Sequence, residues 1–234
     1  LRRLAGKCTM MVLAIQKTNE AGEPIEGEYT TSPCFEHPFD LFNEHEHGAD
    51  LAAYGIKPYR LGTGGPSPWA WEEIRKSKGN VMDHFHVVEM PISIGQQAGY
   101  ARVEPQDEVD YVTAPLIGRR NTDGTYGYFG GFCRAGQGLM EFMEMFKAPS
   151  KMFHPLLGAT QEGFYAGNDN IGTIPYRGFI LAYSNWPEWG DFSGKDINKP
   201  YVDRTYLVRV QYCLRYSEEL KIYEKLLNNS SLAT

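Results

Sequence analysis

Two glutamates interrupt an apolar run, and their position suggests chemistry. Glu141 and Glu144 lie within LMEFMEMFK, residues 139–147. A carboxylate buried in a strand costs free energy unless it is paired or used. If the run is a strand, Glu144 stands near its carboxyl end, where it can activate a water for attack on a phosphoryl group or hold Mg²⁺. The run can equally be an exposed helix in which Glu141 pairs with a neighbour, and spacing alone leaves both readings open.

Two further polar residues flank apolar runs later in the chain. Asn185 follows GFILAYS, and an amide at a strand end can donate to a phosphate or a catalytic water. The alternative is a simple turn-forming asparagine. Arg204 precedes another apolar run, from which it can reach the phosphate of a neighbouring subunit or form a local ion pair.

A metal site is the main rival chemistry. His84 and His86 would place two imidazoles on one face of a strand, a spacing that suits a metal ion. The acidic and histidine-rich residues 44–47 are expected to form a solvated loop. The glycine-rich residues 61–68 lack the Gly-Lys-Ser/Thr sequence of a phosphate-binding loop, so they do not indicate one.

Composition narrows the class of protein. The chain has 234 residues, 42% of them hydrophobic, which favours a folded core over disorder. Its net charge of -6 argues against a general nucleic-acid binder, and the chain has no apolar run long enough to span a membrane. The four cysteines form no CxxC pair and are typical of reduced thiols. We therefore expect a soluble, cytoplasmic protein without nucleic-acid or membrane partners.

Apolar periodicity predicts the elements that would position these residues. Strands are expected at residues 10–15, 84–90, 138–145, 178–185 and 205–213, helices at 49–54, 68–75, 92–102 and 217–228, hairpin turns within 164–176, and loop at 16–43. Strands that alternate with helices indicate a mostly parallel sheet with helices on its faces. Ligands of such sheets bind at the carboxyl ends of the strands, where Glu144 and Asn185 would be neighbours.

Long strings of this sequence resemble one family. CRAGQGLMEFMEMFKAP (133–149), HPLLGATQEGFYAG (154–167), GFILAYSN (178–185) and DRTYLVRVQYCLRYSEELKIYEKLL (203–227) are similar to the PrkA family, bacterial AAA+ proteins described as serine protein kinases. The resemblance implies a three-layer α/β P-loop NTPase core with a mostly parallel sheet flanked by helices. It also implies ATP and Mg²⁺ as ligands and phosphoryl transfer to an unidentified protein substrate.

The resemblance assigns roles to individual residues. Residues 138–145 match the Walker B strand, with Glu144 as the catalytic glutamate. Met143 occupies the place of the usual magnesium-binding acid, so Glu141 becomes the candidate to replace it. Asn185 matches sensor 1, and Arg204 matches an arginine finger, which implies a homo-oligomer in which it acts in trans. Lesser candidates for phosphate or intersubunit contacts are Arg134 and Arg215.

The resemblance also bounds the domain. Residues 1–234 correspond to a partial AAA+ ATPase domain, with an insertion or loop-rich region at 16–80 and the Walker B to post-arginine-finger region at 131–234. The first strand and its P-loop would precede Leu1, and the lid and kinase-like region would follow Thr234, so the fragment alone is expected to be inactive. Two alternatives stay open: a non-hydrolysing regulatory or assembly module, favoured by Met143, and a metal-binding enzyme that uses His84 and His86.

Overall fold

The structure is a computed structural model that describes two compact units. The described residues are 8–62, 64–77, 79–96, 98–104, 116–120, 126–128, 130–148, 150–166 and 172–229. The first unit extends to Val202 and the second begins at Asp203.

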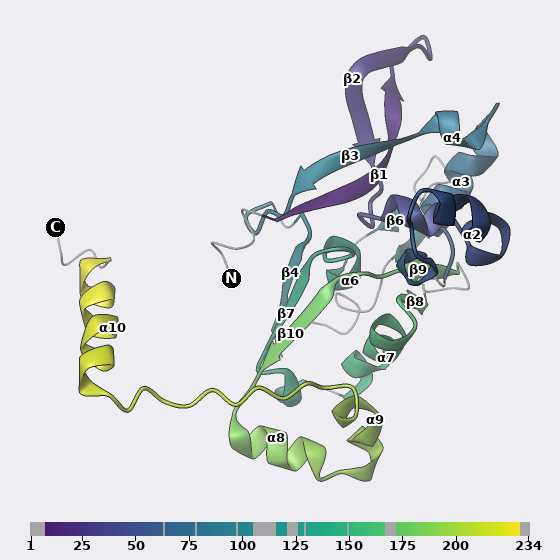
Figure 1. The fold of residues 1–234 in the computed structure, drawn as a ribbon. Helices are drawn as coiled ribbons and strands as arrows, with labels where there is room; N and C mark the ends of the chain where they lie inside the picture. The colour runs from purple at the N-terminus through teal and green to yellow at the C-terminus, as the bar shows by residue number, and fades with distance from the viewer. Residues whose placement is uncertain are drawn as a thin grey trace. The chain divides into compact units, whose positions relative to one another are not determined.

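The first unit contains both strands and short helices (Figure 1). In chain order they are β1 (Thr9–Thr18), β2 (Pro24–Thr31), η1 (Pro38–Leu41), α2 (Glu44–Ala53), η2 (Pro58–Arg60), α3 (Pro68–Lys76), α4 (Val81–His84), β3 (Phe85–Pro91), β4 (Tyr100–Val103), β5 (Leu116–Arg120), β6 (Tyr126–Tyr128), α6 (Gly131–Arg134), β7 (Leu139–Met143), η3 (Met145–Lys147), η4 (Ser150–Phe153), α7 (His154–Gln161), β8 (Phe164–Ala166), β9 (Thr173–Pro175), β10 (Phe179–Tyr183), α8 (Trp186–Ser193), η5 (Asp196–Asn198) and α9 (Lys199–Val202). The second unit contains α10 (Tyr216–Asn228).

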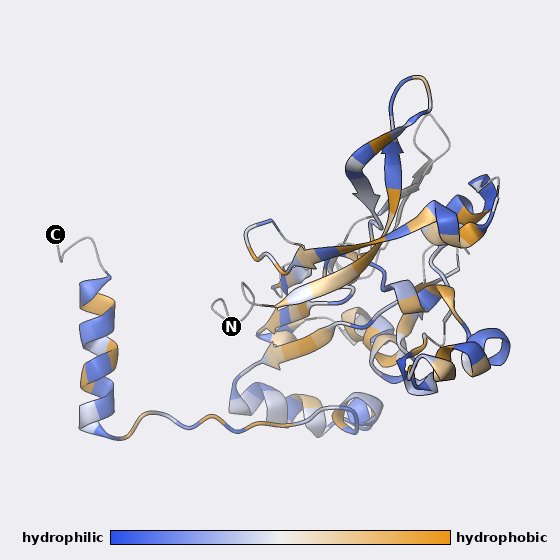
Figure 2. Ribbon diagram, turned by 45° about the horizontal axis from the view of Figure 1, so that its top comes forward, coloured by the Kyte–Doolittle hydropathy of each residue, from blue (hydrophilic) through white to orange (hydrophobic). Residues whose placement is uncertain are grey.

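A three-stranded parallel sheet in the order β10-β7-β4 forms the centre of the first unit. Alternate residues of β7 point to opposite faces, and Met140 and Phe142 are fully buried. They share a hydrophobic core with residues of the flanking helical segments, Phe132 of α6, Phe153 of η4 and Phe192 of α8. Burial of each such large side chain contributes roughly 1.5–3 kcal/mol, so this core fixes the position of β7. Figure 2 shows the apolar character of these strands.

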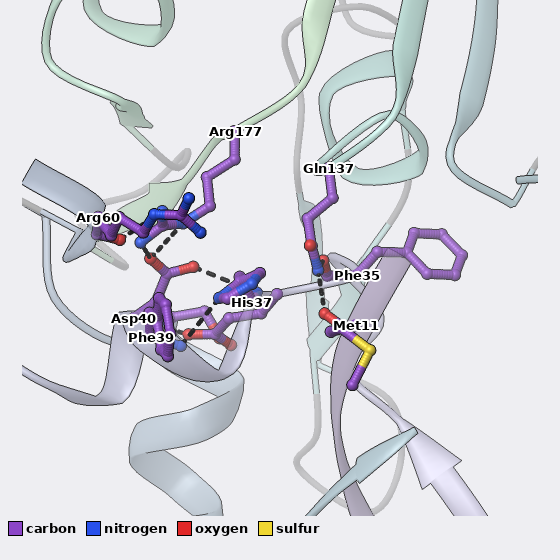
Figure 3. A network of polar contacts seen from close by, with 10 residues as sticks. Met11, Phe35, His37, Phe39, Asp40, Arg60, Gln137 and Arg177 are labelled. Carbon is purple, nitrogen blue, oxygen red and sulfur yellow. Dashed lines mark hydrogen bonds and ion pairs between the residues drawn. The ribbon is translucent and has the colours of Figure 1, made fainter. Parts of the chain in front are cut away.

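A second sheet is antiparallel and has the order β2-β1-β3. The central strand β1 buries Val12 against one side and Leu13 against the other, as the alternation of a strand requires. The amide of Gln137, just before β7, donates to the carbonyl oxygens of Met11 at 2.6 Å and Phe35 at 2.7 Å (Figure 3). These bonds join the antiparallel sheet to the start of the central parallel strand.

Several elements agree with the sequence-based predictions. The strands at β7 and β10, the helix α3 with Ser67 as its N-cap, and the helix α10 all form where expected. Strands β8 and β9 pair antiparallel, as a hairpin requires, whereas the turns predicted around residues 167–170 lie outside the described residues. The helical reading of residues 139–147 is wrong, because 139–143 pair on both sides within the parallel sheet.

Other predictions were wrong in the first unit. Part of the predicted loop 16–43 is strand β2, whose polar residues pair with β1 along an exposed hairpin. Residues 44–47 belong to α2, because the Asn43 side chain caps it by accepting the Glu46 N–H at 2.8 Å. The predicted helix 92–102 is instead a bridge between Ser93 and Ala98 followed by β4.

The second unit departs from the predicted strand at 205–213. This segment is extended but has no strand partner among the described residues, and a strand needs a neighbour to receive its hydrogen bonds. Its apolar side chains, such as Val210 at 88% exposure, are therefore open. Polar and apolar residues alternate around α10 (Figure 2). Within the described parts of both units, every helix is too short or too polar to cross a bilayer.

Candidate active site at the carboxyl edge of the parallel sheet

The parallel pairing of β7 and β10 brings two predicted residues to the same edge of the sheet. Met143, the last residue of β7, pairs with Tyr183, the last residue of β10. Glu144 directly follows the first strand, and Asn185 lies two residues beyond the second. Both side chains therefore begin at the edge where parallel sheets bind ligands, as the sequence predicts.

The backbone of Glu144 is unusual. Its φ is 46°, in the left-handed region, and among the described residues Phe35 is the other non-glycine with positive φ. Such a conformation costs of order 1 kcal/mol or more and tends to persist at functional sites. This left-handed residue ends the in-and-out alternation of β7 and precedes η3. As a result, the Glu144 side chain is 48% exposed and does not point into the core as Phe142 does.

Lys147 and Glu188 connect Glu144 with Asn185. The Lys147 ammonium lies 2.7 Å from a Glu144 carboxylate oxygen and 3.3 Å from one of Glu188. Glu188 also accepts hydrogen bonds from the Ser184 hydroxyl and, at 3.4 Å, from the Asn185 amide. The bond to Glu144 raises the pKa of Lys147, and the bond from Ser184 lowers the pKa of Glu188. One ammonium group thus joins the two carboxylates at the end of the sheet.

Glu141 lies in different surroundings from Glu144. Its carboxylate accepts hydrogen bonds from the hydroxyls of Tyr100 on β4 and, at 2.6 Å, Tyr183 on β10. Burial, and then the Glu141 carboxylate, raises the pKa of Tyr100 to about 12, so this hydroxyl stays protonated and donating. On the same face, the Arg102 guanidinium contacts the sulfur of Met143. Glu141 is therefore part of a ladder of side chains across three strands.

The three predicted arginines belong to two different units. Arg134 ends α6, before the amino end of β7, whereas Glu144 follows its carboxyl end. Arg204 and Arg215 belong to the second unit, where both are exposed and Arg215 precedes α10. Their roles stay predictions.

The histidine pair does not form the arrangement expected of it. His84 is the last residue of α4 and lies 3.2 Å from Glu73, whereas His86 is in β3 beside the ring of Tyr29. The expectation of two imidazoles on one strand face is therefore wrong, because the strand begins at Phe85. In the described part of the chain, no three His, Cys, Asp or Glu side chains are grouped to hold a metal ion.

Sequence reasoning missed Lys147, Glu188 and Ser184. A signal for two of them was present in the spacing. Lys147 follows Glu144 by three residues, within reach once the chain turns, and Glu188 follows Asn185 by three, the spacing of an N-cap and its acidic partner. The spacing does not predict that β7 pairs with β10, and this pairing brings Lys147 close to Glu188.

Comparisons with known proteins assign the chain to a family. Residues 4–234 match the family described as the PrkA AAA domain. A protein named serine/threonine kinase YeaG, from Escherichia coli K12, is 47% identical over 212 residues, which cover 86% of this chain and 33% of that protein. The ATP-dependent protease PrkA of Bacillus subtilis is 28% identical over 213 residues, with the same coverage of each.

One solved structure aligns with part of the chain. A putative ATPase from Cytophaga hutchinsonii aligns with 56% of this chain and 39% of its own, at 19% identity and a TM-score of 0.38. This chain spans about a third of the length of the curated relatives named above. From the family match and the 47% identity, the chain belongs to the PrkA AAA domain family and has its α/β AAA+ fold.

Proposed function

We propose that the protein binds ATP and hydrolyses it at the carboxyl edge of β7 and β10. One observation carries the proposal: Glu144 and Asn185 follow neighbouring parallel strands and are linked through Lys147 and Glu188. Family membership supports nucleotide as the ligand, because AAA domains use ATP. The exposed Glu144 carboxylate is available to a substrate at this edge.

The proposed reaction is an in-line attack of water on the γ-phosphorus of ATP. Glu144 accepts a proton from the attacking water while the oxygen of that water bonds to the γ-phosphorus. The bond between the γ-phosphorus and the β,γ-bridging oxygen breaks, which releases ADP and phosphate. Asn185 orients that water through its amide. Lys147 keeps Glu144 directed toward the sheet edge, while Glu188 holds Lys147 and Asn185 in place.

Mg²⁺ is the metal that such a site would use, and the donors near the edge fit it. Glu144 offers a half-exposed carboxylate, and Glu141, although bonded to two tyrosine hydroxyls, keeps further lone pairs on its oxygens. When bound, the ion neutralises phosphate charge and polarises the γ-phosphoryl group. We assign Glu144 and Glu141 as the carboxylates that would hold it, directly or through water.

We also propose that Arg204 acts across a subunit interface. An arginine supplied in trans stabilises charge on the transferring phosphoryl group, which makes the active protein a homo-oligomer. Mixing Arg204→Ala subunits with Glu144→Gln subunits tests this. Activity recovered in the mixture supports a shared site, and two variants that stay inactive together would exclude it.

For the whole protein, we propose that the nucleotide drives phosphoryl transfer to serine or threonine of a protein substrate. The relative named a serine/threonine kinase is the more similar of the two compared, although the other is named an ATP-dependent protease. A non-hydrolysing regulatory module is the second candidate. It is favoured by Met143, whose sulfur contacts Arg102 where the usual site has an acid.

Nucleotide binding and hydrolysis, measured separately on the full-length protein, test the proposal. Glu144→Gln removes the base but keeps the shape, so we expect ATP binding to persist and the hydrolysis rate to fall at least about 100-fold. Glu46→Gln, in the exposed first turn of α2, is the matched control and should hydrolyse ATP normally. Equal rates in the wild type and Glu144→Gln would remove Glu144 from this role. Binding without hydrolysis in the wild type would favour the regulatory module.

A further inference from the structure

A pocket lies away from the edge of β7 and β10. It has a volume of about 350 Å³ and is lined by His37, Phe39, Tyr59, Arg60 and Arg177. These residues come from η1, η2 and the segment before β10. Arg177 precedes β10 whereas Asn185 follows it, so the two sites are separated by the length of that strand, on the order of 15–20 Å. The volume is at the lower end of the range for small-molecule sites.

Arg177 forms the rigid base of the pocket. Its Nε and Nη2 donate to one oxygen of Asp40 at 2.8 and 2.6 Å, and its Nη1 donates to the Arg60 carbonyl at 2.8 Å (Figure 3). The Asp40 side chain is 2% exposed and also accepts the backbone N–H of His37 at 3.2 Å. The carboxylate is thus beneath the pocket and already paired, and none of the lining residues is acidic.

Arg60 adds a positive charge that, unlike that of Arg177, is not paired with Asp40. Its side chain is exposed, and no described acidic residue forms an ion pair with its guanidinium. His37 accepts the Phe39 N–H at its Nδ1, at 3.0 Å, which leaves Nε2 as the protonated, donating nitrogen of the neutral ring. Burial, followed by the charges of Arg177 and Arg60, lowers the pKa of His37 to about 4, so the ring is neutral near pH 7.

The lining therefore combines donors with aromatic surface. The two guanidinium groups are cationic, and the His37 ring and the Tyr59 hydroxyl can donate. Phe39 and Tyr59 supply the apolar surface, and the Tyr59 side chain is free to adjust because that residue is 76% exposed. Planar guanidinium groups match the geometry of carboxylates and phosphates.

We propose that this pocket binds a small organic oxyanion, with Arg60 donating to a carboxylate or phosphate and Phe39 and Tyr59 contacting the organic part. Arg177 and Asp40 hold the base of the pocket in shape. The proposal is independent of ATP hydrolysis, because it uses none of the residues at the edge of β7 and β10.

Titration calorimetry of the full-length protein with phenyl phosphate, benzoate and inorganic phosphate tests the site. Arg60→Gln removes a guanidinium that has no ion-pair partner among the described residues and leaves the backbone carbonyl that Arg177 uses, so the fold should persist. The matched control is Arg75→Gln, an exposed arginine of α3 outside the pocket. We expect saturable binding of at least one aromatic anion to the wild type and Arg75→Gln, and binding at least tenfold weaker to Arg60→Gln.

An NMR titration of His37 gives a readout that does not depend on enzymatic activity. An anion beside the ring favours its charged form, so ligand should raise the pKa of His37 above about 4. Tighter binding of phenyl phosphate than of benzoate would assign a phosphate, and the reverse order a carboxylate. Equal affinity of Arg60→Gln and wild type, or no saturable binding of any of the three anions, would overturn the proposal. Inorganic phosphate that binds as tightly as phenyl phosphate would overturn the role of the aromatic rings.

Discussion

At the scale of residues, the chemistry of the site is decided by what surrounds each carboxylate. Glu141 and Glu144 are three positions apart, but two tyrosine hydroxyls hold the first, whereas the left-handed turn exposes the second. The ion pair with Lys147 then directs Glu144 along the edge of the sheet. Of the two acids, Glu144 is therefore the better placed to meet a substrate.

Lys147 is predicted to position Glu144. Lys147→Gln removes the ion pairs to Glu144 and Glu188, and small displacements of a catalytic group reduce turnover strongly, so kcat for ATP hydrolysis should fall about tenfold or more with KM nearly unchanged. Lys147→Arg should retain most activity. Lys199→Gln breaks an exposed ion pair of the same i,i+3 spacing and serves as the control in steady-state kinetics. An unaltered kcat in Lys147→Gln would show that the ion pair has no positioning role.

Glu36 is predicted to make stability depend on pH. It is buried, accepts the N–H and hydroxyl of Ser67 at 2.7 and 2.6 Å, and burial raises its pKa from 4.5 to about 7. The folded protein therefore binds a proton that the unfolded chain has lost between pH 4.5 and 7. The free energy of unfolding should fall across that interval, by about 3 kcal/mol from this group, and level off above it.

Urea denaturation at pH 5 and pH 8 measures this effect. Glu36→Gln keeps an acceptor and a donor for Ser67 without the titration, so it should lose less stability than the wild type between the two pH values. The exposed Glu26→Gln is the control. Identical pH dependence of the wild type and Glu36→Gln would contradict the assignment.

At the scale of elements, the position of β7 depends on close backbone contact at its start. A Cβ at Gly138 would overlap the carbonyl of Gly99, which precedes β4. The same carbonyl accepts the N–H of Leu139 at 2.9 Å, so the pairing of β4 with β7 begins at this contact. A glycine here lets the two strands approach in the register that places Glu144 at the edge.

Gly138→Ala is therefore expected to destabilise the protein by roughly 1–3 kcal/mol in urea denaturation, because either strand must move to relieve the overlap. Gly190→Ala is a control for which the expected change in the free energy of unfolding has the opposite sign. Gly190 lies within α8, and a Cβ there meets nothing within 4 Å, so alanine should stabilise the helix by up to about 1 kcal/mol. If Gly138→Ala were as stable as the wild type, the close contact would have no energetic role.

The elements also show how far sequence reasoning extends. The strand β7 was predictable because it is central and buries Met140 and Phe142, and β10 because it is a continuous apolar run whose Ile180 packs against the core. Their carboxyl ends supplied Glu144 and Asn185. Strand β2 was missed, because it is a polar hairpin arm with little burial. The ion pair between Lys147 and Glu188 depends on pairing between segments distant in sequence, which one sequence alone does not reveal.

At the scale of the whole molecule, the proposed ATP site and the oxyanion pocket lie at opposite ends of β10. Arg204 belongs to the second unit, and its proposed part in catalysis depends on the assembly of subunits and not on the parallel sheet. The chain spans about a third of the length of the curated relatives named above.

The central claim is that Glu144 and Asn185 act together on one bound ATP. A double-mutant cycle of Glu144→Gln and Asn185→Ala in the full-length protein, followed by single-turnover ATP hydrolysis, tests it most directly. Residues that act on the same water lose their effects non-additively, so the double variant should be no more than about threefold slower than Glu144→Gln alone. If the two losses multiplied in full, the residues would act independently, and a shared site at the edge of β7 and β10 would be contradicted.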